Sequence, residues 1–187
     1  MSVVEDSPVG TKPTVSVVIV IDYKIGDGSD VNHLVPTLKG LAHQDHTGTK
    51  EFLLIEAGGS SAPLEELRKY LPSVNIVNNS GTTSYDLKNA GCRSARSDLV
   101  VILDADCVPH PGWLSAAVDH HKMHKDAAAI SGKTLYRKEG LLARVFALLD
   151  RSYVDCGRPG KTQAISNNNA AFRRDIPGSL QNPKLPV

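Results

Sequence analysis

The 187-residue sequence is poor in features that would identify several common protein classes. Its three cysteines, Cys92, Cys107 and Cys156, are widely spaced and form no Cys-x-x-Cys pair, which argues against a disulfide framework or a zinc knuckle. Lys and Arg total 21 against 20 Asp and Glu, so the formal net charge of +1 provides no overall field that attracts nucleic acid. We therefore expect a reducing, cytoplasmic environment and no nucleic-acid partner.

Long apolar runs are also missing. No run approaches the roughly 20 residues that a membrane-spanning helix needs. The first 13 residues, MSVVEDSPVGTKP, are acidic and interrupted by prolines, unlike a signal peptide. The most apolar helical stretch, Gly140–Asp150, carries Arg144 near its centre, and we interpret it as an amphipathic helix over the core. Any association with the inner face of a membrane is therefore expected to be peripheral.

Short apolar runs alternate along the chain with stretches of helical periodicity. The apolar runs predict strands at 14–21, 51–55, 74–77 and 99–103, and the periodic stretches predict helices at 30–44, 62–71, 84–95 and 113–124. This alternation predicts one domain with a doubly wound, mostly parallel α/β sheet, Rossmann-like in architecture. Ligands of such sheets bind beyond the carboxyl ends of the strands. Neither G-x-x-x-x-G-K-[ST] nor G-x-G-x-x-G occurs there.

Two aspartates, Asp104 and Asp106, follow the fourth predicted strand. Mg²⁺ and Mn²⁺ prefer hard oxygen ligands, commonly one or two carboxylates completed by water and substrate phosphates. The pair is therefore a candidate metal site. The alternative is that both side chains favour the start of the next helix, where negative charge is stabilising.

The surroundings of this pair resemble the nucleotide-binding half of family 2 glycosyltransferases. The resemblance is carried by three blocks in order: Leu87-Lys88-Asn89-x-Gly91, then Asp104-x-Asp106 after an apolar strand, then Pro111-Gly-Trp-Leu114. Two further blocks agree: the opening strand in PTVSVVIVIDY, and SNNNAAFRRD (166–175), which is similar to a family segment near the transferred sugar. Together they extend from about Thr14 to Asp175.

The resemblance implies an A-type glycosyltransferase fold, incomplete at its C-terminus, and transfer of a sugar from a nucleotide diphosphate sugar. The acceptor, a glycan, lipid or protein, is not identified. The implied domain covers 14–175, between a flexible segment at 1–13 and a tail or truncation point at 176–187. The ligands that the family implies for the metal, Mn²⁺ or Mg²⁺, are Asp106 and Asp104. The nucleotide-sugar site implied by the family comprises Ile21, Tyr23, Glu56, Lys88, Asp104, Ala105 and Asn169.

The sequence departs from the family pattern in two places. The second strand is followed by Glu56-Ala57-Gly-Gly, where the family commonly has Asp-Asp-Gly-Ser, so Ala57 replaces the carboxylate that reads the nucleoside base. After the Phe-Arg-Arg block, Asp175 is the only acid, whereas inverting members place their general base on a later segment. The sequence is therefore expected to be a fragment or to lack this step. The catalytic base stays unassigned, with Asp22, Glu56, Asp155 and Asp175 as candidates.

Two other functions remain open at this point. An apolar strand followed by Asp-x-Asp-x-Val also opens haloacid-dehalogenase-like phosphatases, in which Asp104 would be the nucleophile and Asp106 the acid. That motif normally begins its domain, whereas three strand-helix units precede it here. A non-catalytic module that binds nucleotide sugars is the second alternative. His120 and His124 lie four residues apart, and we interpret them as part of a solvated helix face rather than a metal site.

Overall fold

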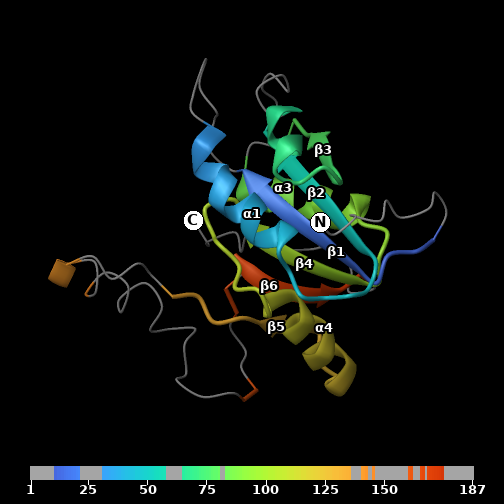
Figure 1. The fold of residues 1–187 in the computed structure, drawn as a ribbon. Coiled ribbons are helices and arrows are strands. Elements are labelled where there is room, and N and C mark those ends of the chain that lie inside the picture. Colours follow the sequence, from blue (N-terminus) through green and yellow to red (C-terminus); the bar gives the residue numbers. More distant parts are fainter. Residues whose placement is uncertain are drawn as a thin grey trace, which may run out of the picture.

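The computed structural model describes residues 11–21, 31–57, 65–80, 83–135, 140–142, 145, 160–161, 165–166 and 168–174. Its centre is a six-stranded sheet with the order β3-β2-β1-β4-β6-β5 (Figure 1). The strands are β1 (Val15–Ile21), β2 (Lys50–Glu56), β3 (Val74–Asn78), β4 (Leu99–Asp104), β5 (Ala129–Ser131) and β6 (Asn169–Arg173). The first four strands are parallel, and β6 runs antiparallel to both β4 and β5. The predicted mostly parallel α/β sheet is confirmed.

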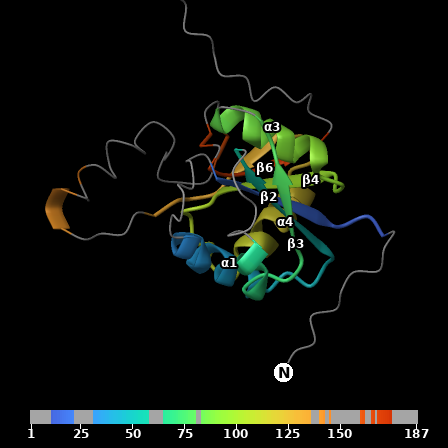
Figure 2. The ribbon, with the colours of Figure 1, turned by 90° about the horizontal axis from the view of Figure 1, so that it is seen from above.

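The helices form two layers on the sheet, as Figure 2 shows from above. One layer is α3 (Ser84–Ser94), and the other contains α1 (Val35–Ala42), which follows the short helix η1 (Val31–Leu34), together with η2 (Glu66–Lys69) and α4 (Trp113–Met123). Alternate residues of each strand enter two cores. On β1, Val17, Ile19 and Ile21 face the α1 layer, whereas Val18 and Val20 face α3.

Local sequence signals account for where these helices begin. Helix α3 starts with a capping box, in which Thr83 Oγ1 accepts from the Asp86 N–H and an Asp86 oxygen accepts from the Thr83 N–H. Helix α4 follows Gly112, which has no side chain to cap it. Gln44, two residues after the end of α1, supplies an acceptor instead, because its Oε1 accepts the Leu114 N–H at 2.8 Å. The contact also anchors α4 to α1.

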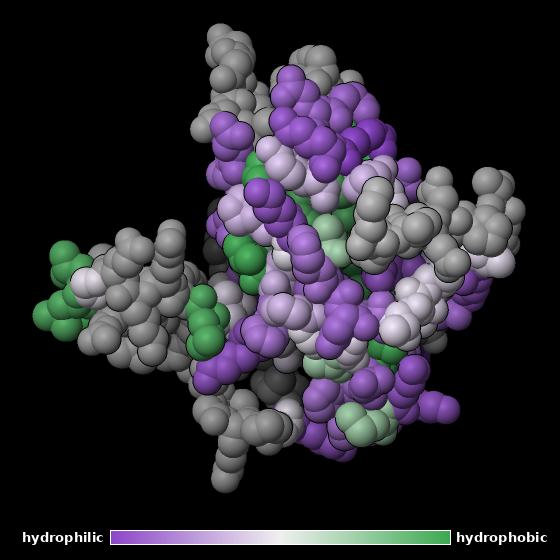
Figure 3. Space-filling view, in the orientation of Figure 1, coloured by the Kyte–Doolittle hydropathy of each residue, from purple (hydrophilic) through white to green (hydrophobic). Residues whose placement is uncertain are grey.

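Two expectations need correction. The helix predicted at 62–71 is, in its described part, mainly the short 3-10 helix η2. The stretch Gly140–Asp150, expected over the core, is described only at 140–142 and 145, which lie away from the sheet (orange in Figure 1). Leu141 and Leu142 are 75% and 73% exposed, in contrast to the mostly hydrophilic surface around the sheet in Figure 3. No helix among the described residues combines the length and apolarity needed to cross a membrane.

Candidate functional site

The paired aspartates lie at the carboxyl edge of the parallel strands. Asp104 is the last residue of β4 and pairs in register with Val20, next to the end of β1. On the other side of β1, Glu56 ends β2 and pairs with Ile21. Three strands thus end level with one another, as expected for the ligand-binding edge of an open α/β sheet.

The backbone that carries the two aspartates is held by hydrogen bonds from several parts of the chain. The Ala105 N–H donates to the Val20 carbonyl at 3.1 Å, and the Ala105 carbonyl accepts from the buried Thr37 hydroxyl at 2.7 Å. The Asp104 N–H donates to the Asn168 carbonyl at 3.2 Å. Because β1, α1 and the segment before β6 all contact this turn, the position of its backbone is fixed by the fold. Sequence patterns gave no indication of Thr37.

Lys88 and Asp104 form an ion pair across the α3 face of the sheet. The distance from Lys88 Nζ to Asp104 Oδ1 is 2.9 Å, and the Lys88 side chain is only 3% exposed. Helix α3 approaches closely because Gly91, one turn after Lys88, has no side chain. A Cβ at Gly91 would lie 2.2 Å from Val18 Cγ1 and 3.1 Å from Ile55 Cγ1. The glycine therefore lets α3 bring a buried cation to the end of β4.

Asp106 has a different environment from Asp104. It is exposed, and the Cys107 thiol donates to its Oδ1 at 3.5 Å. Val108, two residues after Asp106, is 62% exposed, so this side of the turn opens to solvent. Two carboxylates one residue apart, one of them exposed on a fixed turn, are a donor set that suits a hard divalent cation. They contribute two ligands at most, which agrees with the absence of any group of three or more metal-type side chains among the described residues.

Asn169 ties the start of β6 to two neighbouring segments. Its Oδ1 accepts from the Trp113 indole N–H at 2.8 Å, and its Nδ2 donates to the Lys133 carbonyl at 3.3 Å and to Thr134 Oγ1 at 3.4 Å. Gly132 is required for this arrangement, because a Cβ there would lie 2.4 Å from Asn169 Oδ1. Asn169 therefore links the start of β6, next to Asp104, to α4 and to the segment after β5.

The family model of glycosyl transferase family 2 matches residues 31–177. The chain belongs to that family. The comparison with curated proteins gives no match.

Solved structures agree with the family-2 assignment at the level of the fold. S. aureus TarS 1–349 superposes with a TM-score of 0.55 at 17% identity, with 86% of this chain and 47% of that chain covered. Its complex with UDP-GlcNAc gives a TM-score of 0.50 at 18% identity, covering 67% and 38%. This chain thus spans less than half of the length of these structures. The A-type glycosyltransferase fold predicted from the motifs is confirmed.

Family membership also decides between the two enzyme hypotheses. The phosphatase motif normally follows the first strand of its domain, whereas Asp104 here ends β4, the fourth strand in the chain. The matched family is one of glycosyl transferases, so the phosphatase hypothesis is not supported.

The structure brings some of the residues predicted for the nucleotide-sugar site together and separates others. Lys88, Asp104 and Ala105 come together as described above. Ile21 is fully buried in the core. Glu56 is buried at the same edge, but Leu54 belongs to the α1-side core and Ile55 to the α3-side core, so strand alternation directs Glu56 to the α1 side. Glu56 therefore lies at the predicted edge of the sheet, on the opposite face from Lys88 and Asp104, and its place in the nucleotide-sugar site stays a prediction.

Several predicted residues lie outside the part of the chain that the structure describes. These are Tyr23 of the nucleotide-sugar site and the candidate bases Asp22, Asp155 and Asp175.

The end of the 166–175 block lies away from the carboxyl edge of the sheet. Because β6 runs antiparallel to β4, its first residue, Asn169, pairs with Leu103 near Asp104, and its last, Arg173, pairs with Leu99 at the opposite edge. There Arg173 Nη1 donates to the Lys125 carbonyl at 3.0 Å, and the Arg174 N–H donates to the Asp98 carbonyl at 2.8 Å. Only the beginning of the 166–175 block therefore borders the candidate site.

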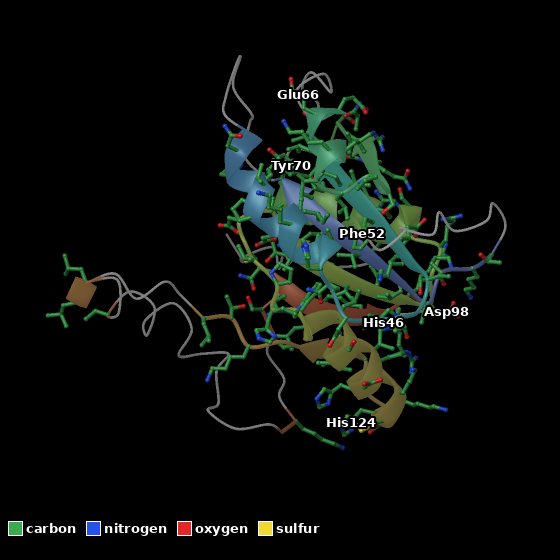
Figure 4. All side chains as sticks on the ribbon, in the orientation of Figure 1. His46, Phe52, Glu66, Tyr70, Asp98 and His124 are labelled. Atoms are coloured by element: carbon green, nitrogen blue, oxygen red, sulfur yellow. The ribbon has the colours of Figure 1, made fainter. Side chains whose placement is uncertain are left out.

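A second buried carboxylate, Glu51, lies at the amino edge of the sheet, where its hydrogen bonds within the protein indicate a structural role. Burial alone would raise the pKa of Glu51, but hydrogen bonds from the Ser16 hydroxyl and from the Arg96 backbone and side chain outweigh it and lower the pKa. Figure 4 shows Asp98 at this same edge, near the start of β4. A cavity of about 240 Å³ also opens there, lined in part by Lys12, Asp98 and Lys122.

The histidine pair of α4 is solvated, as expected. The rings of His120 and His124 stack with their centroids 6.0 Å apart, and both residues are exposed. Trp113, at the start of α4, packs partly buried against the α1-side core and adds the hydrogen bond to Asn169.

Proposed function

We propose that this chain binds a nucleotide diphosphate sugar at the carboxyl edge of β1 and β4, and that it provides the donor half of a glycosyl transfer reaction. The observation that carries the proposal is the Asp104-Ala-Asp106 turn. In a family 2 chain it ends a central parallel strand, and hydrogen bonds from β1, α1 and the segment before β6 hold it. The solved complex of TarS with UDP-GlcNAc, a protein of the same fold, supports the choice of a nucleotide sugar.

In this proposal Asp106, with Asp104 beside it, would hold the divalent cation, Mn²⁺ or Mg²⁺. When bound, the ion would neutralise the diphosphate leaving group. The protein holds the backbone of the turn in place, so little backbone reorganisation is needed as the donor binds. The remaining ligands would come from the diphosphate and water, since the protein presents two carboxylates at this turn.

Calorimetric titration of the protein with UDP tests the proposal. We expect binding with MnCl₂ present and little or none with EDTA. In Asp106→Ala the metal-dependent part is expected to disappear, because the neighbouring carboxylate cannot replace the lost ligand. Asp119→Ala is the matched control, since Asp119 is a 66% exposed aspartate on α4. Equal affinity with Mn²⁺ and with EDTA, or in Asp106→Ala, would contradict the metal site.

The same titration addresses the nucleoside base and the reaction. Because Ala57 stands in place of the family's base-reading carboxylate, we expect weaker discrimination between UDP and GDP than the family pattern implies; a strong preference for UDP would contradict this. Incubation with a panel of nucleotide sugars and Mn²⁺, monitored for released nucleotide, then distinguishes an enzyme from a binding module. Release above the Asp106→Ala background supports catalysis, and binding without release supports the module.

A further inference from the structure

The geometry points to Lys88 as a positioning residue for Asp104 rather than a ligand of the nucleotide. We infer that Lys88 compensates the charge of Asp104 and fixes its orientation, so that the two aspartates have separate tasks and Asp106 carries the exposed charge that meets the metal. This inference rests on the proposed function. It differs from the role that family resemblance gave to Lys88, which was a place beside the nucleotide.

Burial is the first argument. Lys88 is 3% exposed and its Nζ lies 2.9 Å from Asp104 Oδ1, an atom that is itself shielded from solvent. A lysine so deeply buried needs a compensating negative charge within contact distance. A nucleotide that contacts Nζ directly would need this buried group to become exposed. An indirect action through Asp104 requires no such exposure.

The construction of α3 is the second argument. The capping box at Thr83 and Asp86 determines where the helix begins, and Gly91 lets it lie directly against Val18. Lys88 lies between these two points and shares the buried face of α3 with Leu87, Ala90 and Gly91. The position of its ammonium group is therefore set by the fold before any ligand binds, as a positioning role requires.

The contrast between the two aspartates is the third argument. The Asp104 side chain is 27% exposed and paired with a buried cation, whereas Asp106 is exposed and contacts the Cys107 thiol. A divalent cation is attracted most to the carboxylate whose charge is least compensated. The two aspartates therefore have different roles. The charge of Asp104 is compensated by Lys88, which also orients the carboxylate, whereas Asp106 keeps an exposed charge that would bind the metal.

A double-mutant cycle on Mn²⁺-dependent UDP binding tests this inference. The variants are Lys88→Met, which keeps the length of the side chain without its charge, Asp104→Asn, and the double variant. We expect Lys88→Met to weaken binding about tenfold or more. We expect the double variant to bind within about threefold of Asp104→Asn alone, since Lys88 has no effect without its partner's charge. If Lys88 contacts the nucleotide directly, the two effects multiply in the double variant, and the inference is overturned.

Further variants separate positioning from folding and from loss of charge. Lys88→Arg keeps the positive charge and is expected to stay within about threefold of the wild type. Lys122→Met removes a 66% exposed lysine on α4 and is expected to leave binding unchanged. Thermal melting is measured in parallel. If Lys88→Met lowers the melting temperature but its folded protein binds UDP like the wild type, the role is structural only and the inference fails.

The failures of the two proposals are distinguishable. If the wild-type protein shows no Mn²⁺-dependent UDP binding, the proposed function fails, and the inference falls with it. If the wild type binds and Asp106→Ala does not, but the effects of Lys88→Met and Asp104→Asn are multiplicative, only the inference about Lys88 fails.

Discussion

Replacing Gly91 with alanine tests whether the close approach of α3 builds the site. The added Cβ would lie 2.2 Å from Val18 Cγ1 and 3.1 Å from Ile55 Cγ1, and both neighbours are fully buried. Overpacking a filled core typically costs about 1–3 kcal/mol, and so short a contact puts this case at the upper end. Alanine regains about 1 kcal/mol of helix propensity over glycine. The free energy of unfolding should therefore fall by about 2 kcal/mol.

Urea denaturation measures this change directly, and a fall of about 4–8 °C in melting temperature is expected alongside it. The matched control is Gly112→Ala, where a Cβ would meet its nearest neighbours, on Asp45 and His110, at 3.6 and 3.9 Å. Gly112 precedes α4 as its N-cap, so this variant should lose no more than about 1 kcal/mol. Gly91→Ala should also weaken Mn²⁺-dependent UDP binding, because α3 carries Lys88. Unchanged or increased stability in Gly91→Ala would refute the packing argument.

Two further predictions concern hydrogen bonds at the two edges of the sheet. Thr37→Val keeps the side-chain shape but leaves the buried Ala105 carbonyl without its hydroxyl donor. It should lower the free energy of unfolding by about 1–3 kcal/mol and weaken Mn²⁺-dependent UDP binding. Thr37→Ser keeps the hydroxyl and should retain both stability and binding. Equal losses in Thr37→Ser and Thr37→Val would contradict the role of the hydroxyl. The lowered pKa of Glu51 means that its stabilising effect is complete above the ordinary value of 4.5 and is lost as the pH falls through the lower folded-state value. Denaturation between pH 5 and about pH 3 should therefore show a smaller loss of stability in Glu51→Gln than in the wild type, and equal slopes would refute this role.

The sequence was sufficient to predict the parallel part of the sheet. The four strands predicted from apolar runs agree with β1 to β4 to within one residue at each end, because a strand buried on both faces needs a continuous apolar run. The position of the Asp104-x-Asp106 pair at the carboxyl edge followed from the same pattern. Both results depend only on local sequence and on the general topology of α/β sheets.

What the sequence could not provide depends on contacts between distant segments. The single residue by which β2 extends beyond its predicted end makes Glu56 part of the strand, and alternation then directs it away from Asp104. The antiparallel direction of β6 carries Arg173 to the opposite edge, which no periodicity within 166–175 reveals. Thr37 looked like an ordinary helix residue, since the carbonyl that it serves is 68 positions away.

The two edges of the sheet show why a carboxylate alone does not identify a site. Glu51 is buried, and its oxygens accept hydrogen bonds from Ser16 and from the backbone and side chain of Arg96, so its charge is satisfied within the protein. At the other edge, hydrogen bonds from the protein hold the backbone of the turn, and the buried Lys88 ammonium group pairs with Asp104. Asp106 remains exposed. A rigid turn with an exposed charge attracts an outside partner of opposite sign, whereas a satisfied carboxylate stabilises the fold. The combination of fixed backbone and exposed charge is therefore what makes the carboxyl edge the candidate site.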